Sequence, residues 1–157
     1  MVVAIMNIES KPINFFTRRI IDNLGCVNPL YIYGNGDKSE ILREIYNYYK
    51  SNNKNIILDY SQGFMRKLRV AKMNREDKLF EDKYKNIDIL LIDDIQYFST
   101  KAATQDVLYR ILDFLYKNNK VTVATSDVAV DELDGFYEII KDIFKLGKQI
   151  EINCPLI

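Results

Sequence analysis

The segment that most constrains the fold of this chain is the run ILLIDD at residues 89–94. Four apolar residues in succession, without polar alternation, are typical of a strand buried on both faces, as in a parallel sheet covered by helices. The two acids would then lie at the carboxyl end of the strand, the edge where ligands bind in such sheets. We therefore predict a buried central strand that delivers Asp93 and Asp94 to the ligand-facing edge.

The remaining pattern alternates between strands and helices. Apolar runs predict further strands at residues 30–33, 55–60, 121–124 and 149–153. Helical spacing of apolar residues predicts helices at 12–24, 39–49, 104–116 and 130–146, and two short helices within 61–85. Alternation of this kind gives right-handed crossovers and a mostly parallel sheet. The predicted fold class is α/β, a three-layer domain like that of P-loop NTPases, with a mostly parallel five-stranded sheet.

Length and composition limit the function classes. The 157 residues suffice for one domain, which we divide into an N-terminal helical segment (1–27) and a core (28–153). Lys and Arg balance Asp and Glu at 22 each, so a nucleic-acid role would require a local patch. The absence of histidine removes histidine-based catalysis and metal binding. We recognise no signal peptide and no membrane span, so we expect a cytoplasmic protein without membrane contacts.

Three polar segments follow predicted strands and should meet at one sheet edge. They are GNGDKS at residues 34–39, the pair Asp93-Asp94, and TSD at residues 125–127. This is the general plan of a P-loop nucleotide site, in which loop N–H groups bind phosphates and strand-end acids manage Mg²⁺ and water. The residues that could bind nucleotide in this plan are Gly34, Gly36, Lys38, Ser39 and Asp93.

The glycine loop departs from the P-loop pattern GxxxxGK[ST]. Gly34 lies four positions before Lys38 instead of six, and Asp37 replaces the glycine that should precede the lysine. A carboxylate about 4 Å from a phosphate charge costs about 4 kcal/mol at an effective dielectric constant near 20. A helix N-terminus offsets about 0.3–1 kcal/mol of this. The loop therefore disfavours ATP binding in the standard mode and also fits a plain turn in which Asp37 or Ser39 caps the next helix.

Three segments resemble the AAA+ core of the bacterial replication initiator DnaA, which the related regulator Hda shares. They are NPLYIYG at residues 28–34, YKNIDILLIDDIQY at 84–97, and TSD at 125–127. The resemblance implies that Asp93 is the Mg²⁺-associated acid and Asp94 the water-activating acid, with Asp127 in the sensor 1 region. It also makes Lys38 and Ser39 the counterparts of the lysine and hydroxyl residue of the P-loop.

The departures from that family concern ATP handling. The stretch at 139–144 contains no arginine where the family carries its arginine finger, and the chain ends before the family's lid and helix-turn-helix domain. We therefore expect vestigial acids at Asp93, Asp94 and Asp127, with no catalytic residue and no resident cofactor or metal. The alternative is binding of Mg-ATP or Mg-ADP, with Asp93 holding the magnesium.

A basic segment lies between the second and third predicted strands. Residues 61–75 carry five cations and no acid: Arg66, Lys67, Arg69, Lys72 and Arg75. The resemblance implies a helix that contacts single-stranded DNA, and a charge of this size on one short segment could support such binding. A solvated helix face is the alternative interpretation.

The predicted function is that of a non-catalytic or weakly nucleotide-binding DnaA/Hda-like protein. It would act in the initiation of DNA replication or its regulation through contacts with replication proteins, such as an initiator, a sliding clamp or a replicative helicase. Two alternatives remain open: an ATP/ADP-binding switch that uses a short P-loop, and a single-stranded DNA-binding or helicase-loading accessory.

Overall fold

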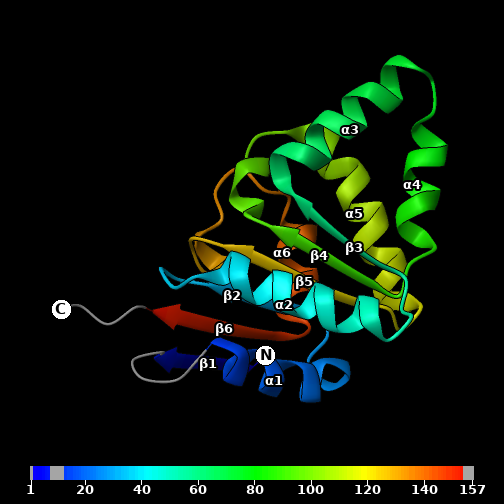
Figure 1. The fold of residues 1–157 in the computed structure, drawn as a ribbon. Helices are drawn as coiled ribbons and strands as arrows, with labels where there is room; N and C mark the ends of the chain where they lie inside the picture. Colours follow the sequence, from blue (N-terminus) through cyan, green and yellow to red (C-terminus); the bar gives the residue numbers. More distant parts are fainter. Residues whose placement is uncertain (1, 8–12, 154–157) are drawn as a thin grey trace.

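A single parallel sheet organises the chain (Figure 1). The structure, a computed structural model, describes residues 2–7 and 13–153, with side chains from residue 15 onward. The strand order is β1-β6-β2-β5-β4-β3. The strands are β1 (Val2–Asn7), β2 (Leu30–Tyr33), β3 (Ile56–Tyr60), β4 (Ile89–Asp93), β5 (Val121–Ser126) and β6 (Lys148–Asn153). Every neighbouring pair is parallel.

Helices cover both faces of this sheet. They are α1 (Ile13–Asn23), α2 (Lys38–Ser51), α3 (Ser61–Met73), α4 (Asp77–Lys85), α5 (Ala102–Lys117) and α6 (Glu138–Lys145), with short 3₁₀ turns η1 (Leu24–Cys26), η2 (Ile95–Phe98) and η3 (Val130–Glu132). The first two helices pack on one face and the other four on the opposite face (Figure 1). These are the three layers that the alternating pattern predicts, so the predicted α/β fold class is confirmed.

Strand β4 has the central, buried position that its sequence predicts. It lies between β3 and β5, and all five of its residues are buried. Leu90 and Ile92 belong to the core under α3–α6, while Ile89 and Leu91 belong to the core under α1 and α2. A strand with an apolar core on each side cannot alternate polar and apolar residues, which explains the uninterrupted apolar run.

The crossovers place the site at the end of β2. After β2 the chain forms α2 on one face of the sheet and then β3 at the edge of the sheet. It continues through β4 to β5, each strand lying closer to β2, and the helices α3 to α6 lie on the opposite face. Strands β5 and β6 flank β2, so the crossover direction reverses there. Such a switch point opens a crevice beyond the carboxyl ends of the strands.

Two elements differ from the sequence-based expectations. All five predicted strands are present, but Val2–Asn7 adds a sixth, β1, so the segment 1–27 is not entirely helical. Its apolar, β-branched run can extend the sheet because β6 offers a free edge for parallel pairing. The helix predicted for 130–146 is wrong as a single element: it splits into η3 and α6. Gly135 breaks it with a left-handed φ of 71°, packed against the backbone of Thr100.

Candidate nucleotide site at the sheet edge

The glycine loop after β2 packs directly on the end of β6. The Gly36 N–H donates to the Ile152 carbonyl oxygen at 2.8 Å. Gly34 has a φ of 108°, and a Cβ built on it would lie 2.3 Å from that same oxygen. A Cβ on Gly36 would lie 2.3 Å from the Ile152 Cγ2. Both glycines are therefore required by close packing between the loop and β6.

Lys38, the first residue of α2, is folded back over this loop. Its ammonium donates to the carbonyl oxygen of Gly34 at 2.5 Å and lies 3.4 Å from that of Gly36. The side chain is 9% exposed, and its Nζ lies 3.9 Å from a carboxylate oxygen of Asp127. The cation that would meet a phosphate in a P-loop is thus already engaged by backbone carbonyls of its own turn.

Asp37 caps α2. Its carboxylate accepts a hydrogen bond of 3.1 Å from the Glu40 N–H, one of the free donors of the first helical turn. The predicted cap is therefore present, and it is made by Asp37. It also places a negative charge at the helix N-terminus, where a bound phosphate would otherwise interact with the helix dipole.

Asp93 lies at the centre of the site and is 1% exposed. The Ser39 hydroxyl donates to its Oδ2 at 2.5 Å, and the Thr125 hydroxyl donates to its Oδ1. Ser39 and Asp93 are therefore in contact, as the P-loop plan predicts for the pair that shares a magnesium ion. The partner Thr125 lies inside β5, which extends two residues further than the sequence suggested.

Asp94 and Asp127 lie beside this pair and are linked by one side chain. Asp94 follows β4 in the left-handed conformation, and its N–H donates to the Thr125 hydroxyl oxygen at 2.9 Å. The Gln96 amide donates to Asp127 at 3.0 Å and lies 3.5 Å from an Asp94 carboxylate oxygen. Burial, reinforced by the charge of Asp93, raises the pKa of Asp94. The bridge through Gln96 joins residues from two strand ends, so no local sequence pattern indicates it.

The loop donors show how well this site fits a nucleotide. A β-phosphate in a P-loop accepts hydrogen bonds from loop and first-turn N–H groups. Here the Gly36 N–H donates to Ile152, the Lys38 N–H to the Gly36 carbonyl at 3.0 Å, and the Glu40 N–H to Asp37. These three donors and the Lys38 ammonium therefore have partners within the protein, and each would have to leave its partner before it could bind a β-phosphate.

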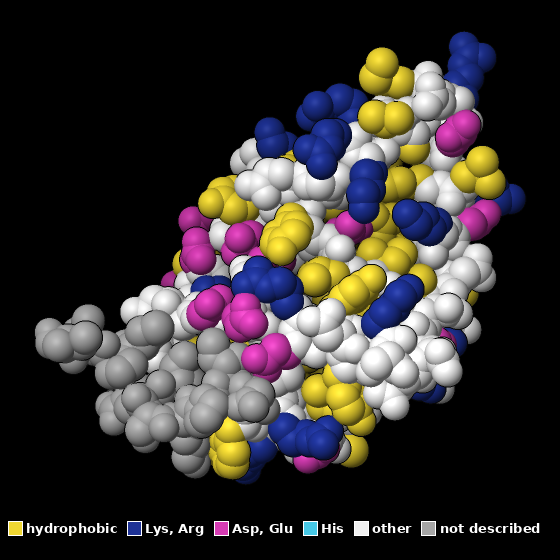
Figure 2. Space-filling view, in the orientation of Figure 1, with side chains coloured by type: hydrophobic (Ala, Val, Ile, Leu, Met, Phe, Trp, Pro, Cys, Tyr) yellow, Lys and Arg dark blue, Asp and Glu magenta, His cyan; other side chains and the backbone are white. Residues whose placement is uncertain are grey.

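The basic segment predicted for residues 61–75 forms α3 and the turn after it. Lys67 lies apart from the rest because its ammonium pairs at 2.6 Å with the buried Asp59, which also accepts a hydrogen bond from Tyr84. The other four cations are exposed and form no ion pair within the part of the chain that the structure describes: Arg66, Arg69, Lys72 and Arg75. Figure 2 shows basic side chains gathered over α3, interspersed with apolar ones.

Sequence comparison assigns the family. Residues 14–151 match the sequence profile of the bacterial DnaA ATPase domain. The chain belongs to this family. DnaA of Buchnera aphidicola is 34% identical over 132 residues, which cover 82% of this chain and 30% of that protein. The chain thus spans about a third of the length of the curated DnaA relatives it matches.

Solved DnaA structures share the fold. "Replication initiator DnaA bound to AMPPCP and single-stranded DNA" has a TM-score of 0.81 and 28% identity, covering 86% of this chain and 43% of that one. DnaI, at a TM-score of 0.71 and 21% identity over 88% of this chain and 82% of its own, shows the fold alone. The resemblance to the DnaA AAA+ core is confirmed, while the narrower likeness to Hda stays a prediction.

Among the described residues, no helix is long and apolar enough to cross a membrane.

Proposed function

We propose that this DnaA-type domain acts in the initiation of DNA replication or its regulation through contacts with other replication proteins, without hydrolysing ATP. The observation that carries the proposal is the closed glycine loop. The Lys38 ammonium is bound by the carbonyl oxygens of Gly34 and Gly36, and the loop itself is bonded to β6 through Ile152. The chain therefore keeps the fold of the family, while the groups that bind phosphate in a P-loop form hydrogen bonds within the protein.

Nucleotide binding would require several of these contacts to break together. The Gly36–Ile152 hydrogen bond would have to open, and Lys38 would have to leave its carbonyl partners. The Asp37 carboxylate would still oppose the phosphate, at about 4 kcal/mol per charge pair 4 Å apart when the effective dielectric constant is near 20. These costs act in the same direction and support a domain that is not an ATPase.

Calorimetry tests the nucleotide part of the proposal. The chain is titrated with Mg-ADP and Mg-ATP, and phosphate release from ATP is followed in parallel. We expect no heat of binding at micromolar nucleotide and no release above that of a Lys38→Ala variant. Micromolar binding that Lys38→Ala abolishes would instead establish an ATP/ADP switch with a short loop.

Binding measurements with purified replication proteins test the contact part. The chain is immobilised and exposed in turn to the initiator DnaA, the sliding clamp and the replicative helicase of the same organism. We expect saturable binding to one of the three. The proposal of a role through these contacts is wrong if none binds at tens of micromolar.

Single-stranded DNA binding is a second candidate function, supported by α3. Four exposed cations without ion pairs in the described part of the chain, Arg66, Arg69, Lys72 and Arg75, lie on or just beyond one helix. If all four met phosphates, the logarithm of affinity would fall against the logarithm of salt concentration with a slope of about −3. Arg66 and Arg69 occupy positions three apart, which face the same side of a helix.

The salt dependence of oligothymidylate binding tests this candidate by fluorescence anisotropy. The variant Arg66→Ala/Arg69→Ala should reduce the affinity and should make the slope shallower by about 1.4 units, half of its value. Lys50→Ala, an exposed cation on α2 at the opposite face of the sheet, is the matched control and should leave both unchanged. A flat slope for the unaltered chain removes the candidate.

A further inference from the structure

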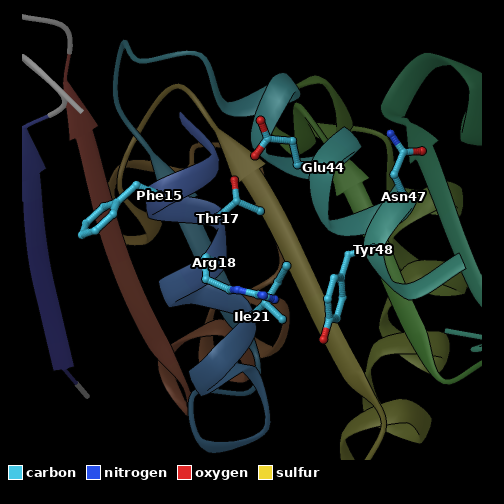
Figure 3. Close-up of a pocket in the computed structure, with 7 residues that line it drawn as sticks. All are labelled: Phe15, Thr17, Arg18, Ile21, Glu44, Asn47 and Tyr48. Carbon is cyan, nitrogen blue, oxygen red and sulfur yellow. The ribbon is translucent and has the colours of Figure 1, made fainter. Parts of the chain in front are cut away.

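A cavity of about 780 Å³, wide open to solvent, lies on the surface between α1 and α2, away from the sheet-edge site. Its lining comes from both helices and consists of Phe15, Thr17, Arg18, Ile21, Glu44, Asn47 and Tyr48. Figure 3 shows Thr17 and Glu44 together at one end, and Arg18 and Tyr48 at the other. The glycine loop and its acids contribute no residue to this lining, so the cavity is not explained by the nucleotide fold.

Two polar atoms of the lining are buried without a partner. The Thr17 hydroxyl oxygen and the Glu44 Oε2 are enclosed, and neither has a hydrogen-bond partner among the described residues. Thr17 as a whole is 3% exposed. A buried carboxylate oxygen without a donor is costly, and such atoms are normally paired in folded proteins. The carboxylate oxygen only accepts hydrogen bonds and the hydroxyl can accept as well as donate, so this end of the cavity is suited to an external donor that carries positive charge.

The opposite end of the cavity carries a positive charge. The Arg18 guanidinium lies over the Tyr48 ring, 5.6 Å from its centroid. It forms no ion pair with Glu44 or with any other acid in the described part of the chain. The cation that lines the cavity therefore lies over an aromatic face and does not pair with the Glu44 carboxylate. The cavity thus has a carboxylate and a hydroxyl at one end and a guanidinium at the other, with the apolar side chain of Ile21 beside Arg18 (Figure 3).

We propose that this cavity binds the side chain of a lysine presented by a segment of a partner protein. The ammonium, which has three donors and no acceptor, bonds to Glu44 and Thr17. The methylene chain packs along Ile21 and Tyr48, since lysine stems bury readily on apolar surface. Arg18 then meets the backbone carbonyls beside the lysine. The proposal is independent of the nucleotide question, and it gives one protein contact a defined chemistry.

The cation at the far end selects a protein segment over a free polyamine. A polyamine carries charge along its length and offers no acceptor to Arg18, so its second ammonium would be repelled. A lysine residue within a chain has carbonyl oxygens close to its single charge. The two-ended lining therefore matches an amino-acid residue better than a small organic cation.

The variants that test this site preserve its shape. Glu44→Gln removes the charge and Thr17→Val removes the hydroxyl, each with little change in volume. Glu40→Gln is the matched control because Glu40 lies one turn earlier on the same helix, outside the cavity, where it pairs with Arg43. Circular dichroism and thermal unfolding establish that each variant is folded before binding is measured.

Binding is measured by ¹⁵N-resolved NMR titration with a blocked pentapeptide, Gly-Gly-Lys-Gly-Gly. Parallel titrations use the acetyl-lysine and norleucine versions of the peptide, and spermidine. We expect saturable shifts confined to α1 and α2 for the lysine peptide, weakened about tenfold by Glu44→Gln and about threefold by Thr17→Val, and unchanged by Glu40→Gln. The proposal is overturned if no saturation occurs, if the uncharged peptides bind equally well, or if spermidine binds more tightly than the lysine peptide.

Discussion

The hydroxyl of Ser39 donates a 2.5 Å hydrogen bond to the buried carboxylate of Asp93, joining the start of α2 to the end of β4. In a P-loop protein this pair holds the magnesium ion of the nucleotide. Here the two side chains bond to each other, and the second carboxylate oxygen of Asp93 accepts a hydrogen bond from the Thr125 hydroxyl. The Ser39–Asp93 contact that the P-loop plan predicts is therefore made directly between the two side chains, and it should contribute to stability in the absence of any ligand.

Replacing Ser39 by alanine tests that contribution. The substitution leaves the Asp93 Oδ2 without the donor it has in the structure, and Asp93 is 1% exposed. We expect the free energy of unfolding, measured by urea denaturation, to fall by about 1–3 kcal/mol. Ser51→Ala removes an exposed serine hydroxyl at the other end of α2 and should change it by less than about 0.5 kcal/mol. Equal losses in the free energy of unfolding for the two substitutions would contradict a stabilising role for the Ser39 hydrogen bond.

Gly34→Ala should destabilise the fold because the loop has no room for a Cβ. The new atom would lie 2.3 Å from a backbone oxygen of β6, at a left-handed φ of 108°. We expect a loss of more than about 2 kcal/mol in the free energy of unfolding. Gly63→Ala is the control, because a Cβ there meets nothing within 4 Å and lies in helix α3. It should stabilise the protein by about 0.5–1 kcal/mol, and a comparable loss at both glycines would refute the packing argument.

Local patterns allowed much of the fold to be predicted. The apolar run of β4 indicated burial on both faces, and the spacing of Asp37 before α2 indicated its cap. Both depend on neighbours in the sequence, where periodicity and capping chemistry operate. The AAA+ assignment followed from the residues around β4 and was confirmed by the family match.

Contacts between distant segments account for what the sequence did not reveal. Gly34 and Gly36 pack closely on Ile152 of β6. The spacing of the two glycines in the sequence could not show whether they serve this packing or phosphate binding. The pairing of β1 with β6 likewise joins the two ends of the chain, residues 2–7 and 148–153, so no local pattern indicates it. The cavity between α1 and α2 depends on how Thr17 and Glu44 face each other across two helices, which helical periodicity does not specify.

The cations of α3 should separate into structural and exposed groups. Lys67→Ala removes the ammonium 2.6 Å from the buried Asp59 and leaves Tyr84 as the donor to that carboxylate. Because the Lys67 side chain is 46% exposed, solvent screens the pair, and we expect a loss of about 1–2 kcal/mol in the free energy of unfolding. Arg66→Ala, one residue earlier and exposed, should change stability by less than about 0.5 kcal/mol. A smaller loss for Lys67→Ala than for Arg66→Ala would reverse this assignment.

Asp94 should make stability depend on pH in a defined direction. Its pKa is raised by burial and by the charge of Asp93, so the folded protein holds the Asp94 proton more tightly than the unfolded chain does. The free energy of unfolding therefore decreases as pH rises from the ordinary carboxyl value through the raised value, and the loss persists above it. Asp94→Asn lacks this titration and keeps an oxygen that can accept from Gln96. Urea denaturation between about pH 4 and pH 7 should show the variant gaining stability relative to the unaltered chain as pH rises. A difference between the two proteins that stays constant across this range, or shrinks, would show that Asp94 does not carry the linkage.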